Sequence, residues 1–538
     1  MKAKRQPGNL NRRAHSFQLR RVAVALVLFA GPGALWAQTN SAGAPPEASF
    51  TVSRFEVTGD NPLDAARTQE ILKPYLGAQQ GIAGLESARA ALDAAVRAAG
   101  FSLYHVTLPP QDTIDVIRIN VGRVKIVHVE VRGQKYFDEA NIRASVPALV
   151  AGETPDIRAV ARDLEIANDD PAKHTTLGLK GSDTDDGIDA VLQTADRDPL
   201  SLTVGYNTSG NDDQGGRGRV VGYLQDANLF GLDQVAGLAY TTSPSEPDQV
   251  KQYGVYYKAP IYNWGGAFSA SYSYSSVSTG ALGSGQVVTG AGRTTGVSYT
   301  EYLYPIGSYR SSVALGFDDK LFVSPVINGA TAPGGDVRSR PVSATYVASY
   351  TPSWGTLSLN LEYDKNLNSG AYNTDASYSA NRFGATNDWD ALRLVGSVAV
   401  PFAHGWAFSS VVRGQYSSDP LIAGEQFGLG GAASIRGAEE RAVTGDSGVA
   451  ATVEIYTPEL YTGLRLLGFS DNGYIERHDP VAGETSHETL QSVGVGLRYS
   501  WQNAAQVSVD YGYITHGSRY PSVPTGSSRV HANLTYTF

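Results

Sequence analysis

The sequence predicts a transmembrane β-barrel of about sixteen antiparallel strands, preceded by two small α/β domains. Three observations indicate this fold: an export signal at the start of the chain, two similar helix-containing segments after it, and a period-two alternation of apolar and hydrophilic residues from Leu200 to the last residue. The 30 Tyr residues support a membrane location, because Tyr combines an apolar ring with a polar tip and suits membrane interfaces.

Residues 1–37 are predicted to be a signal peptide. A long basic segment precedes an apolar core at 22–30, and a cleavage site is predicted at Leu35-Trp36-Ala37. A membrane anchor is the alternative, but the apolar core is about half of the ~20 residues that a spanning helix needs. No other stretch is long and apolar enough for such a helix, so a membrane form of this chain requires β-structure. Residues 38–49 are predicted to be a linker.

Composition and motifs argue against several classes of protein. The net charge is −9, which argues against a nucleic-acid-binding protein, because phosphate contacts need a basic face. There is no Cys, and the nine His residues show no metal-ligand spacing. No nucleophile motif or phosphate-binding loop occurs in its required setting. We therefore expect no enzymatic activity, no cofactor and no bound metal.

The region before the barrel consists of two copies of one α/β pattern, 50–122 and 123–198. Each copy is expected to run strand, helix, helix, strand, strand, and such a repeat indicates a duplicated domain. The predicted strands lie at 50–57, 101–108, 114–121, 124–131, 174–179 and 188–193, and the predicted helices at 64–76, 85–99, 138–146 and 156–168. An exposed sheet edge in either domain can accept a strand from an extended peptide. The alternative is that the two domains act only as spacers.

Residues 199–538 are predicted to form the barrel. In the last strand Val530, Leu534 and Phe538 share one apolar face, while His531 lies on the hydrophilic one. An apolar face toward lipid and a hydrophilic face toward a wet lumen are typical of a transmembrane barrel. A soluble β-sandwich also alternates, but the length of the region, the export signal and the Tyr-rich outer face favour the barrel.

A Gly-rich loop, residues 417–447, separates the strands predicted at 406–416 and 448–457. The barrel begins on the side of the α/β domains, so this loop falls on the opposite, outer side. A loop of this length inside a regular protein is usually functional. It carries the cation Arg436 within Ser434-Ile435-Arg436-Gly437, and it is expected either to be displayed outside or to fold back into the lumen.

These features together resemble the TpsB family, the outer-membrane partners in two-partner secretion that export haemolysins and filamentous-haemagglutinin-like adhesins. The resemblance covers nearly the whole mature chain and identifies the two α/β domains as POTRA-like. The motifs that carry it are Leu108-Pro109-Pro110-Gln111, Arg162-Asp163-Leu164-Glu165 with Asn168, Asn228-Leu229-Phe230-Gly231, Glu425-Gln426-Phe427 with Gly430-Gly431, Ile435-Arg436-Gly437 and Gly445-Asp446-Ser447-Gly448.

The resemblance implies that residues 417–447 are the family's loop six, which folds into the lumen. Its Arg would pair with the acid of a Phe-x-Asp-x-Gly motif on the barrel wall, here Phe469, Asp471 and Gly473. Arg436 and Asp471 are therefore expected to form an ion pair in the lumen. A solvated loop Arg, contributing roughly 0–1 kcal/mol, is the alternative.

The chain departs from the family pattern after the Arg-Gly pair, where Ala438 stands in place of an aromatic residue. Only about a dozen residues separate the predicted cleavage site from the first domain, too few for an N-terminal plug helix, so plugging is expected from loop six or not at all. Phe538, a C-terminal aromatic residue, resembles the recognition signal for outer-membrane barrel assembly. It also fits an ordinary membrane-facing position.

The functional expectation is export of a large unfolded exoprotein, haemolysin- or adhesin-like, across the bacterial outer membrane. The POTRA-like domains would dock this partner in the periplasm and the lumen would conduct it. The barrel assembly machinery and outer-membrane lipid are further expected partners. The alternatives are an insertase for other membrane proteins, against which the presence of only two domains argues, and a passive porin, which would need no docking domains.

Overall fold

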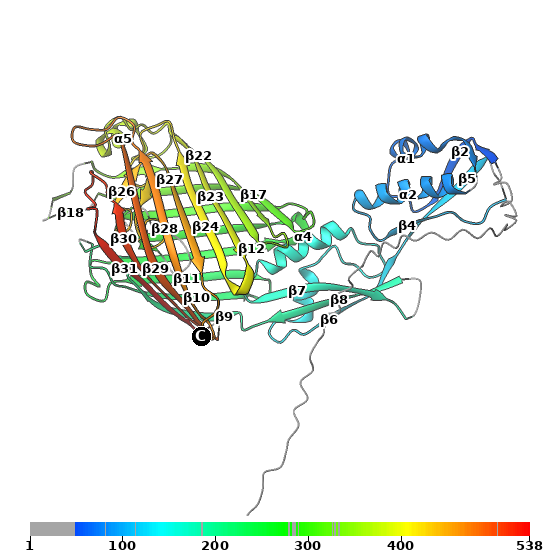
Figure 1. Cartoon of the computed structure of the whole chain (residues 1–538), viewed down its shortest axis with the longest axis horizontal. Helices are drawn as coiled ribbons and strands as arrows, with labels where there is room; N and C mark the ends of the chain where they lie inside the picture. The colour runs from blue at the N-terminus through cyan, green and yellow to red at the C-terminus, as the bar shows by residue number, and fades with distance from the viewer. Residues whose placement is uncertain are drawn as a thin grey trace, which may run out of the picture.

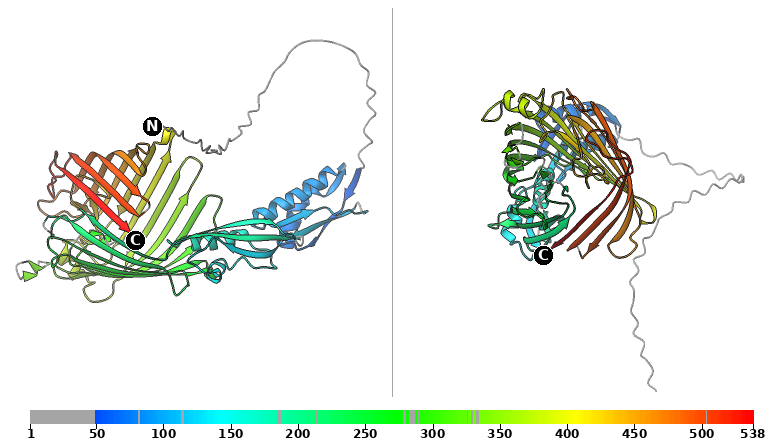
Figure 2. Two further views of the ribbon diagram at one scale, coloured as in Figure 1. Left: turned by 90° about the horizontal axis from the view of Figure 1, so that it is seen from below. Right: turned by 90° about the vertical axis from the view of Figure 1, so that its left-hand side faces the viewer.

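The computed structural model describes residues 49–80, 82–112, 115–183, 187–212, 214–277, 280–281, 287–288, 290–324, 326–327, 330–331, 334–502 and 504–538. Two α/β domains project from one end of a closed antiparallel barrel, and α5 (Asp375–Asn381) lies at the other end (Figure 1; Figure 2). This confirms the predicted fold class. The predicted signal peptide, and the predicted linker up to residue 48, lie outside the described residues.

The first α/β domain has a three-stranded sheet in the order β2-β5-β4, with β2 parallel to β5. Its elements are β1 (Ser49–Val52), β2 (Arg54–Gly59), α1 (Ala65–Leu72), the 3₁₀ helix η1 (Lys73–Tyr75), β3 (Gly77–Gln80), α2 (Ala83–Ala98), β4 (Tyr104–Thr107) and β5 (Val116–Arg123). The single strand predicted at 50–57 is wrong. It divides at Ser53, and its first part, which begins at Ser49 inside the predicted linker, pairs with the unpredicted β3.

Two helix ends in this domain follow from single residues. The helix predicted at 64–76 leaves α-geometry after Leu72, because Pro74 cannot continue it. Helix α2 is followed by Gly100 at φ +99°, and Phe101 N–H donates to Val96 O, which closes the helix. The apolar face of α2, formed by Leu85, Ala88, Leu92 and Val96, is buried.

The second α/β domain repeats the topology, with sheet order β6-β8-β7 and β6 parallel to β8. Its elements are β6 (Lys125–Arg132), α3 (Glu139–Ala144), α4 (Ile157–Asn168), β7 (Lys173–Gly181) and β8 (Gly187–Asp196). Asp138 and Asp156 cap α3 and α4 by accepting hydrogen bonds from backbone N–H groups of the first turn. Among the described residues β7 pairs with no strand other than β8, so its other edge is free of a neighbouring strand.

The described part of the barrel has sixteen strands, as predicted, with β20 and β21 counted as one strand because both pair with β17. They are β9 (Leu200–Asn207), β10 (Arg219–Leu229), β11 (Gln234–Thr242), β12 (Lys251–Ile261), β13 (Gly266–Ser275), β16 (Gly292–Tyr302), β17 (Tyr309–Phe322), β20 (Val337–Ser339) with β21 (Pro341–Tyr350), β22 (Thr356–Asn366), β23 (Asp390–Pro401), β24 (Ala407–Tyr416), β27 (Ser447–Tyr456), β28 (Leu464–Glu476), β29 (His487–Trp501), β30 (Ala505–His516) and β31 (Ser528–Thr537). Pairing of β31 with β9 closes the ring.

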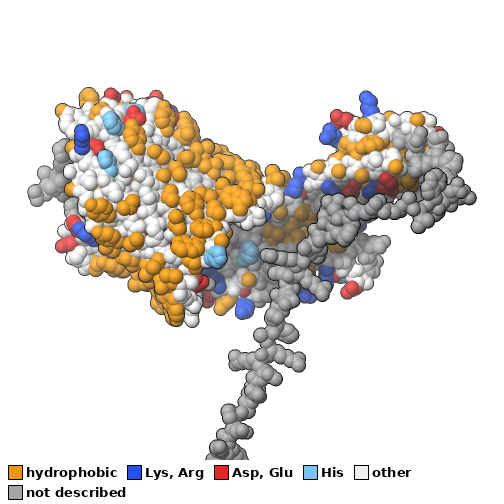
Figure 3. All heavy atoms as spheres, in the orientation of Figure 1, with side chains coloured by type: hydrophobic (Ala, Val, Ile, Leu, Met, Phe, Trp, Pro, Cys, Tyr) orange, Lys and Arg blue, Asp and Glu red, His pale blue; other side chains and the backbone are white. Residues whose placement is uncertain are grey.

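The outer face of the barrel is apolar. Leu200, Leu202, Val204 and Tyr206 alternate along β9 and are all exposed, because they point toward lipid. Hydrophobic side chains cover much of the barrel face in Figure 3, and few charged side chains interrupt them. None of the helices in the described ranges is long and apolar enough to span a membrane.

The links between strands contain a few short elements. They are η2 (Tyr262–Trp264), β14 (Gly280–Ala281), β15 (Val287–Val288), β18 (Val326–Ile327), β19 (Ala330–Thr331), η3 (Ala403–Gly405), β25 (Phe427–Leu429) and β26 (Val443–Gly445). The last two pair with each other inside the longest link described between barrel strands, which is the loop singled out from the sequence.

Candidate functional site

Loop six, defined here as residues 417–446, folds back into the barrel as a hairpin built on β25 and β26. It ends one residue earlier than predicted, because Ser447 already belongs to β27. Apolar side chains of the loop and of the strands behind it form one buried cluster: Leu429, Ile435, Ala438, Val443, Ala450, Ile475, Leu490 and Ile514. The loop is therefore packed against the wall like a small core.

The structure brings Arg436 and Asp471 together in the lumen. Arg436 Nε lies 2.9 Å from Asp471 Oδ2 and Arg436 Nη2 lies 2.7 Å from Asp471 Oδ1, while the Arg436 backbone N–H also donates to Oδ2 at 3.0 Å. Arg436 is 2% exposed and Asp471 is fully buried. This bidentate geometry is the strong form of an Arg–carboxylate contact, because two parallel hydrogen bonds fix the guanidinium plane.

The three residues of the Phe-x-Asp-x-Gly motif share one face of β28, since they are two positions apart. The Phe469 ring lies under the guanidinium, with 3.4 Å between the ring centroid and Arg436 Cζ. A side chain at Gly473 would collide with Leu429 and Ile435 of loop six, its Cβ falling 2.6 Å from a Leu429 methyl. The motif thus supplies a supporting ring, an anion and the space for the hairpin.

The other residues of the loop tip are also held. Ile435 is fully buried, and the backbone oxygen of Ser434 lies 3.5 Å from the hydroxyl of Thr452 on the wall. Gly437 has φ +100°, a conformation that favours glycine. Its N–H donates to His531 Nε2 at 3.2 Å. The tip therefore contacts the wall through side chains and backbone together.

Two further carboxylates beside Arg436 were missed by sequence reasoning. Glu454 Oε1 lies 2.6 Å from Arg436 Nη1, and Asp510 lies 3.7 Å away. Arg498 compensates the excess negative charge through two hydrogen bonds to Asp510, at 2.8 and 3.0 Å. Neither of these two carboxylates, nor Arg498, was predicted to lie beside Arg436. Lumen-facing acids on neighbouring strands would have been the only signal.

Glycines on the wall make room for this group. Gly494 faces the Phe469 ring, since a Cβ there would lie 2.3 Å from the ring edge. At Gly512 a Cβ would lie 2.4 Å from the Arg436 carbonyl carbon. The backbone of the tip therefore rests directly on the backbone of β30, and this contact requires glycine.

The end of the barrel that bears the α/β domains forms a second organised region, around Lys173 at the start of β7. The Lys173 side chain is fully buried, and its Nζ lies 2.5 Å from Asp233 Oδ2 and 3.1 Å from Asn141 Oδ1. Asp233 belongs to the β10–β11 turn, at φ +56°. Its Oδ2 also accepts a hydrogen bond from the Tyr262 hydroxyl at 2.5 Å. A buried ion pair therefore fixes the second α/β domain to two barrel turns.

Motif residues from the sequence analysis gather at this junction. Arg162 lies over the Tyr304 ring at 5.0 Å, and Glu165 lies 3.7 Å from Arg310. Burial raises the pKa of Glu165 to about 7, and burial likewise raises the pKa of Asp170 to about 7. The helix motif thus belongs to the contact between domain and barrel. In the first domain, Gln111 instead pairs with the backbone of Arg118 on β5.

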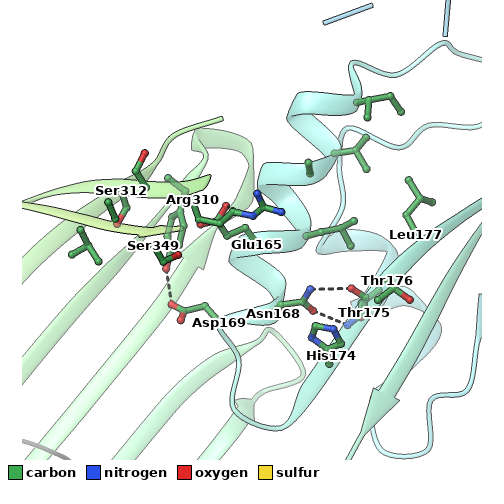
Figure 4. Close-up of a pocket in the computed structure, with 18 residues that line it drawn as sticks. Glu165, Asn168, Asp169, His174, Thr175, Thr176, Leu177, Arg310, Ser312 and Ser349 are labelled. Carbon is green, nitrogen blue, oxygen red and sulfur yellow. Dashed lines mark hydrogen bonds and ion pairs between the residues drawn. The ribbon is translucent and has the colours of Figure 1, made fainter. Parts of the chain in front are cut away.

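A cavity of about 830 Å³ opens between α4, β7 and the rim of the barrel (Figure 4). Val160, Leu164 and Leu177 line it from the domain, and Arg310 and Ser349 line it from the barrel. Its position beside the free edge of β7 and at the mouth of the lumen makes it a candidate binding site for an extended chain.

Phe538 lies at the barrel seam, and its backbone N–H donates to Leu202 O on β9 at 2.9 Å. Its ring, which is exposed, packs edge-on against Tyr536 with centroids 4.6 Å apart. We expect deletion of Phe538 to lower the amount of assembled barrel without changing transport per barrel. Heat-modifiable gel mobility measures assembly, and Phe538→Trp, which keeps an aromatic end, should assemble normally. Unchanged assembly after the deletion would contradict this role.

Known protein families match both the barrel region and the first α/β domain. The family model for haemolysin secretion/activation protein ShlB/FhaC/HecB matches residues 186–499, and the ShlB-type POTRA domain matches residues 50–122. No curated protein matches the sequence.

Solved structures that share the fold include two CdiB proteins. CdiB from Escherichia coli is 19% identical, with a TM-score of 0.76 over 93% of this chain and 92% of that one. CdiB from Acinetobacter baumannii is 14% identical, with a TM-score of 0.70 over 92% and 91% of the two chains. With the family model matching more than half of its length, the chain belongs to the haemolysin secretion/activation protein ShlB/FhaC/HecB family.

Proposed function

We propose that this chain exports a large unfolded exoprotein, haemolysin- or adhesin-like, by docking it at the second POTRA domain and conducting it through the lumen beside loop six. Family membership supports the general part of this function: the chain is an outer-membrane transporter of two-partner secretion, its POTRA region is periplasmic, and its partner is an exoprotein. The docking site, the route and the chemistry of the cargo are the proposed part. The barrel assembly machinery and outer-membrane lipid are proposed as its other partners.

The free edge of β7 supports docking by strand addition. Thr175 N–H donates to Asn168 Oδ1 at 2.6 Å, and Asn168 Nδ2 donates to Thr175 O at 2.9 Å, so the side-chain amide pairs with Thr175 as a neighbouring strand would (Figure 4). Backbone groups along an antiparallel strand alternate in direction, so Leu177 and Leu179 direct theirs to the same edge as Thr175. An extended peptide can pair with them beyond the point that Asn168 occupies.

The lumen continues from this groove. Asp169 lines both the cavity at β7 and a second cavity of about 700 Å³ inside the barrel. Most residues in the wall of the second cavity are small or polar, among them Ser269, Ser298 and Thr345. Such a wall offers hydrogen bonds without large apolar surfaces that would hold an unfolded chain. Residues of the cargo leaving β7 would therefore enter a wet and weakly adhesive passage.

Leu179→Pro tests the docking step. Proline removes the N–H that Leu179 directs to the free edge, and edge positions tolerate it. We expect secretion of the partner exoprotein to fall several-fold while the barrel assembles normally. The measurement is the amount of exoprotein in the culture medium, set against the amount of folded barrel in the outer membrane.

Leu179→Ala is the matched control, because it removes the same side chain and keeps the N–H. Equal secretion by the Pro and Ala variants would overturn docking at this edge. Deleting the whole chain separates the function from its alternatives. Loss of many outer-membrane barrels at once would identify an insertase instead, and undisturbed exoprotein secretion would refute export.

A further inference from the structure

Loop six has a second ionic attachment, at Glu425, where the loop enters the hairpin. Its partners lie on β17 and β23, a different sector of the wall from the strands that hold the Arg436 tip. Lys320 Nζ lies 3.2 Å from Glu425 Oε1, and Arg393 Nη2 lies 2.9 Å from Oε2. Glu425 is 3% exposed. A carboxylate this buried needs both cations to remain charged.

The attachment extends beyond one ion pair. Arg393 also contacts the carboxylate of Asp364 and lies 3.6 Å from Glu362, so the cation is itself held in place by the wall. Gln415 on β24 donates to the backbone oxygen of Glu425 at 3.0 Å and to that of Asp446 at 3.0 Å. Both sides of the hairpin base are thereby tied to β24, and the Glu425 carboxylate is tied to β17 and β23.

We propose that Glu425 is a second positioning residue of the transporter, bracing loop six across the lumen against Lys320 and Arg393. Arg436 then holds the loop at its tip and Glu425 holds it at the base of the β25–β26 hairpin. Release of either fastening leaves the loop held by the other. The contacts of the brace exist without cargo. Only their role in export rests on the proposed function.

The brace adjoins the open part of the lumen. A cavity of about 510 Å³ is lined by Lys320, Arg393 and Glu425 on one side and by Ser271 and Ser273 on the other. Loop six thus forms one boundary of this space, and the Glu425 contacts set how far the loop extends into it. Loosening the brace should widen the passage on that side.

Planar-bilayer conductance of the purified full-length protein tests the brace without any cargo. Glu425→Gln removes the charge and keeps the size of the side chain, so we expect larger or more frequent openings than in the unaltered protein. Lys320→Met should give the same phenotype. The double variant Glu425→Gln with Lys320→Met should change conductance no more than either single substitution, because both substitutions remove the same contact.

Combining Glu425→Gln with Arg436→Ala should raise conductance by more than the two separate increases together, because that pair removes the ionic contacts of both the tip and the hairpin base. Glu439→Gln is the matched control: this carboxylate is also on loop six but pairs with Arg529, at 2.9 Å, outside the brace. Unchanged conductance in Glu425→Gln, or an equal change in Glu439→Gln, would overturn the proposal. Gel mobility confirms that each variant is folded, and secretion assays judge the export function separately.

Discussion

Replacing Arg436 with Ala is expected to reduce exoprotein secretion to a small fraction of normal while the barrel still assembles. The substitution leaves Asp471 and Glu454 buried without their cation, and losing one partner of a buried pair costs about 3–5 kcal/mol. The sixteen paired strands do not depend on this contact, but the position of the loop tip does. Exoprotein in the medium, divided by folded barrel in the outer membrane, measures the effect.

One conservative variant and one control variant test whether the guanidinium group of Arg436 is responsible. Arg436→Lys keeps the charge but cannot reach Asp471 and Glu454 with separate nitrogens, so it should restore little secretion. Arg217→Ala is the matched control, because Arg217 is exposed on an outer loop and, among the residues that the structure describes, its ion-pair partner is the exposed Asp212. Normal secretion by Arg436→Ala would show that the ion pair has no part in export.

Replacing Lys173 with Met is expected to loosen the second α/β domain from the barrel and to impair secretion strongly. Asp233 would remain buried beside Asn141 without a cation, again at a cost of about 3–5 kcal/mol. Limited proteolysis of the assembled protein should then cut near the junction, around residues 197–199, faster than in the unaltered chain.

The companion variants test whether the charge is responsible. Asp233→Asn combined with Lys173→Met removes both charges and keeps a residue type that tolerates φ +56°, so much of the protease resistance should return. Lys180→Met, on the same strand, removes an exposed Lys and should change nothing measurable. Fast cleavage in the double variant would indicate that Lys173 acts by packing alone.

Much of the fold follows from local sequence signals. Alternation of apolar and polar residues predicted all sixteen strands, because each barrel strand has one face toward lipid and one toward water. The helix predicted at 85–99 corresponds to α2. The strand β3 was not predicted, because its four residues carry no alternation and pair only with β1. Short strands of this kind depend on a partner distant in sequence.

Some residues of the candidate site were likewise predicted from the sequence, and others were not. Family motifs pointed to Arg436 and Asp471, since two short patterns each mark one half of the pair. Glu454 and Glu425 did not stand out as partners of particular cations. The sequence pattern around a lumen-facing carboxylate is the same whether that carboxylate is solvated or paired. Only the stagger of neighbouring strands decides which cation lies opposite it.

The sequence by itself determined the class of protein: two α/β domains, a barrel and a Gly-rich loop that carries Arg436. The tertiary structure decided how that loop is held. It placed Glu425 between Lys320 and Arg393 on one part of the wall and Arg436 among three carboxylates on another. The physical reason is barrel closure, which brings charges that are distant in the chain into a narrow lumen, where a buried charge is stable only with a partner.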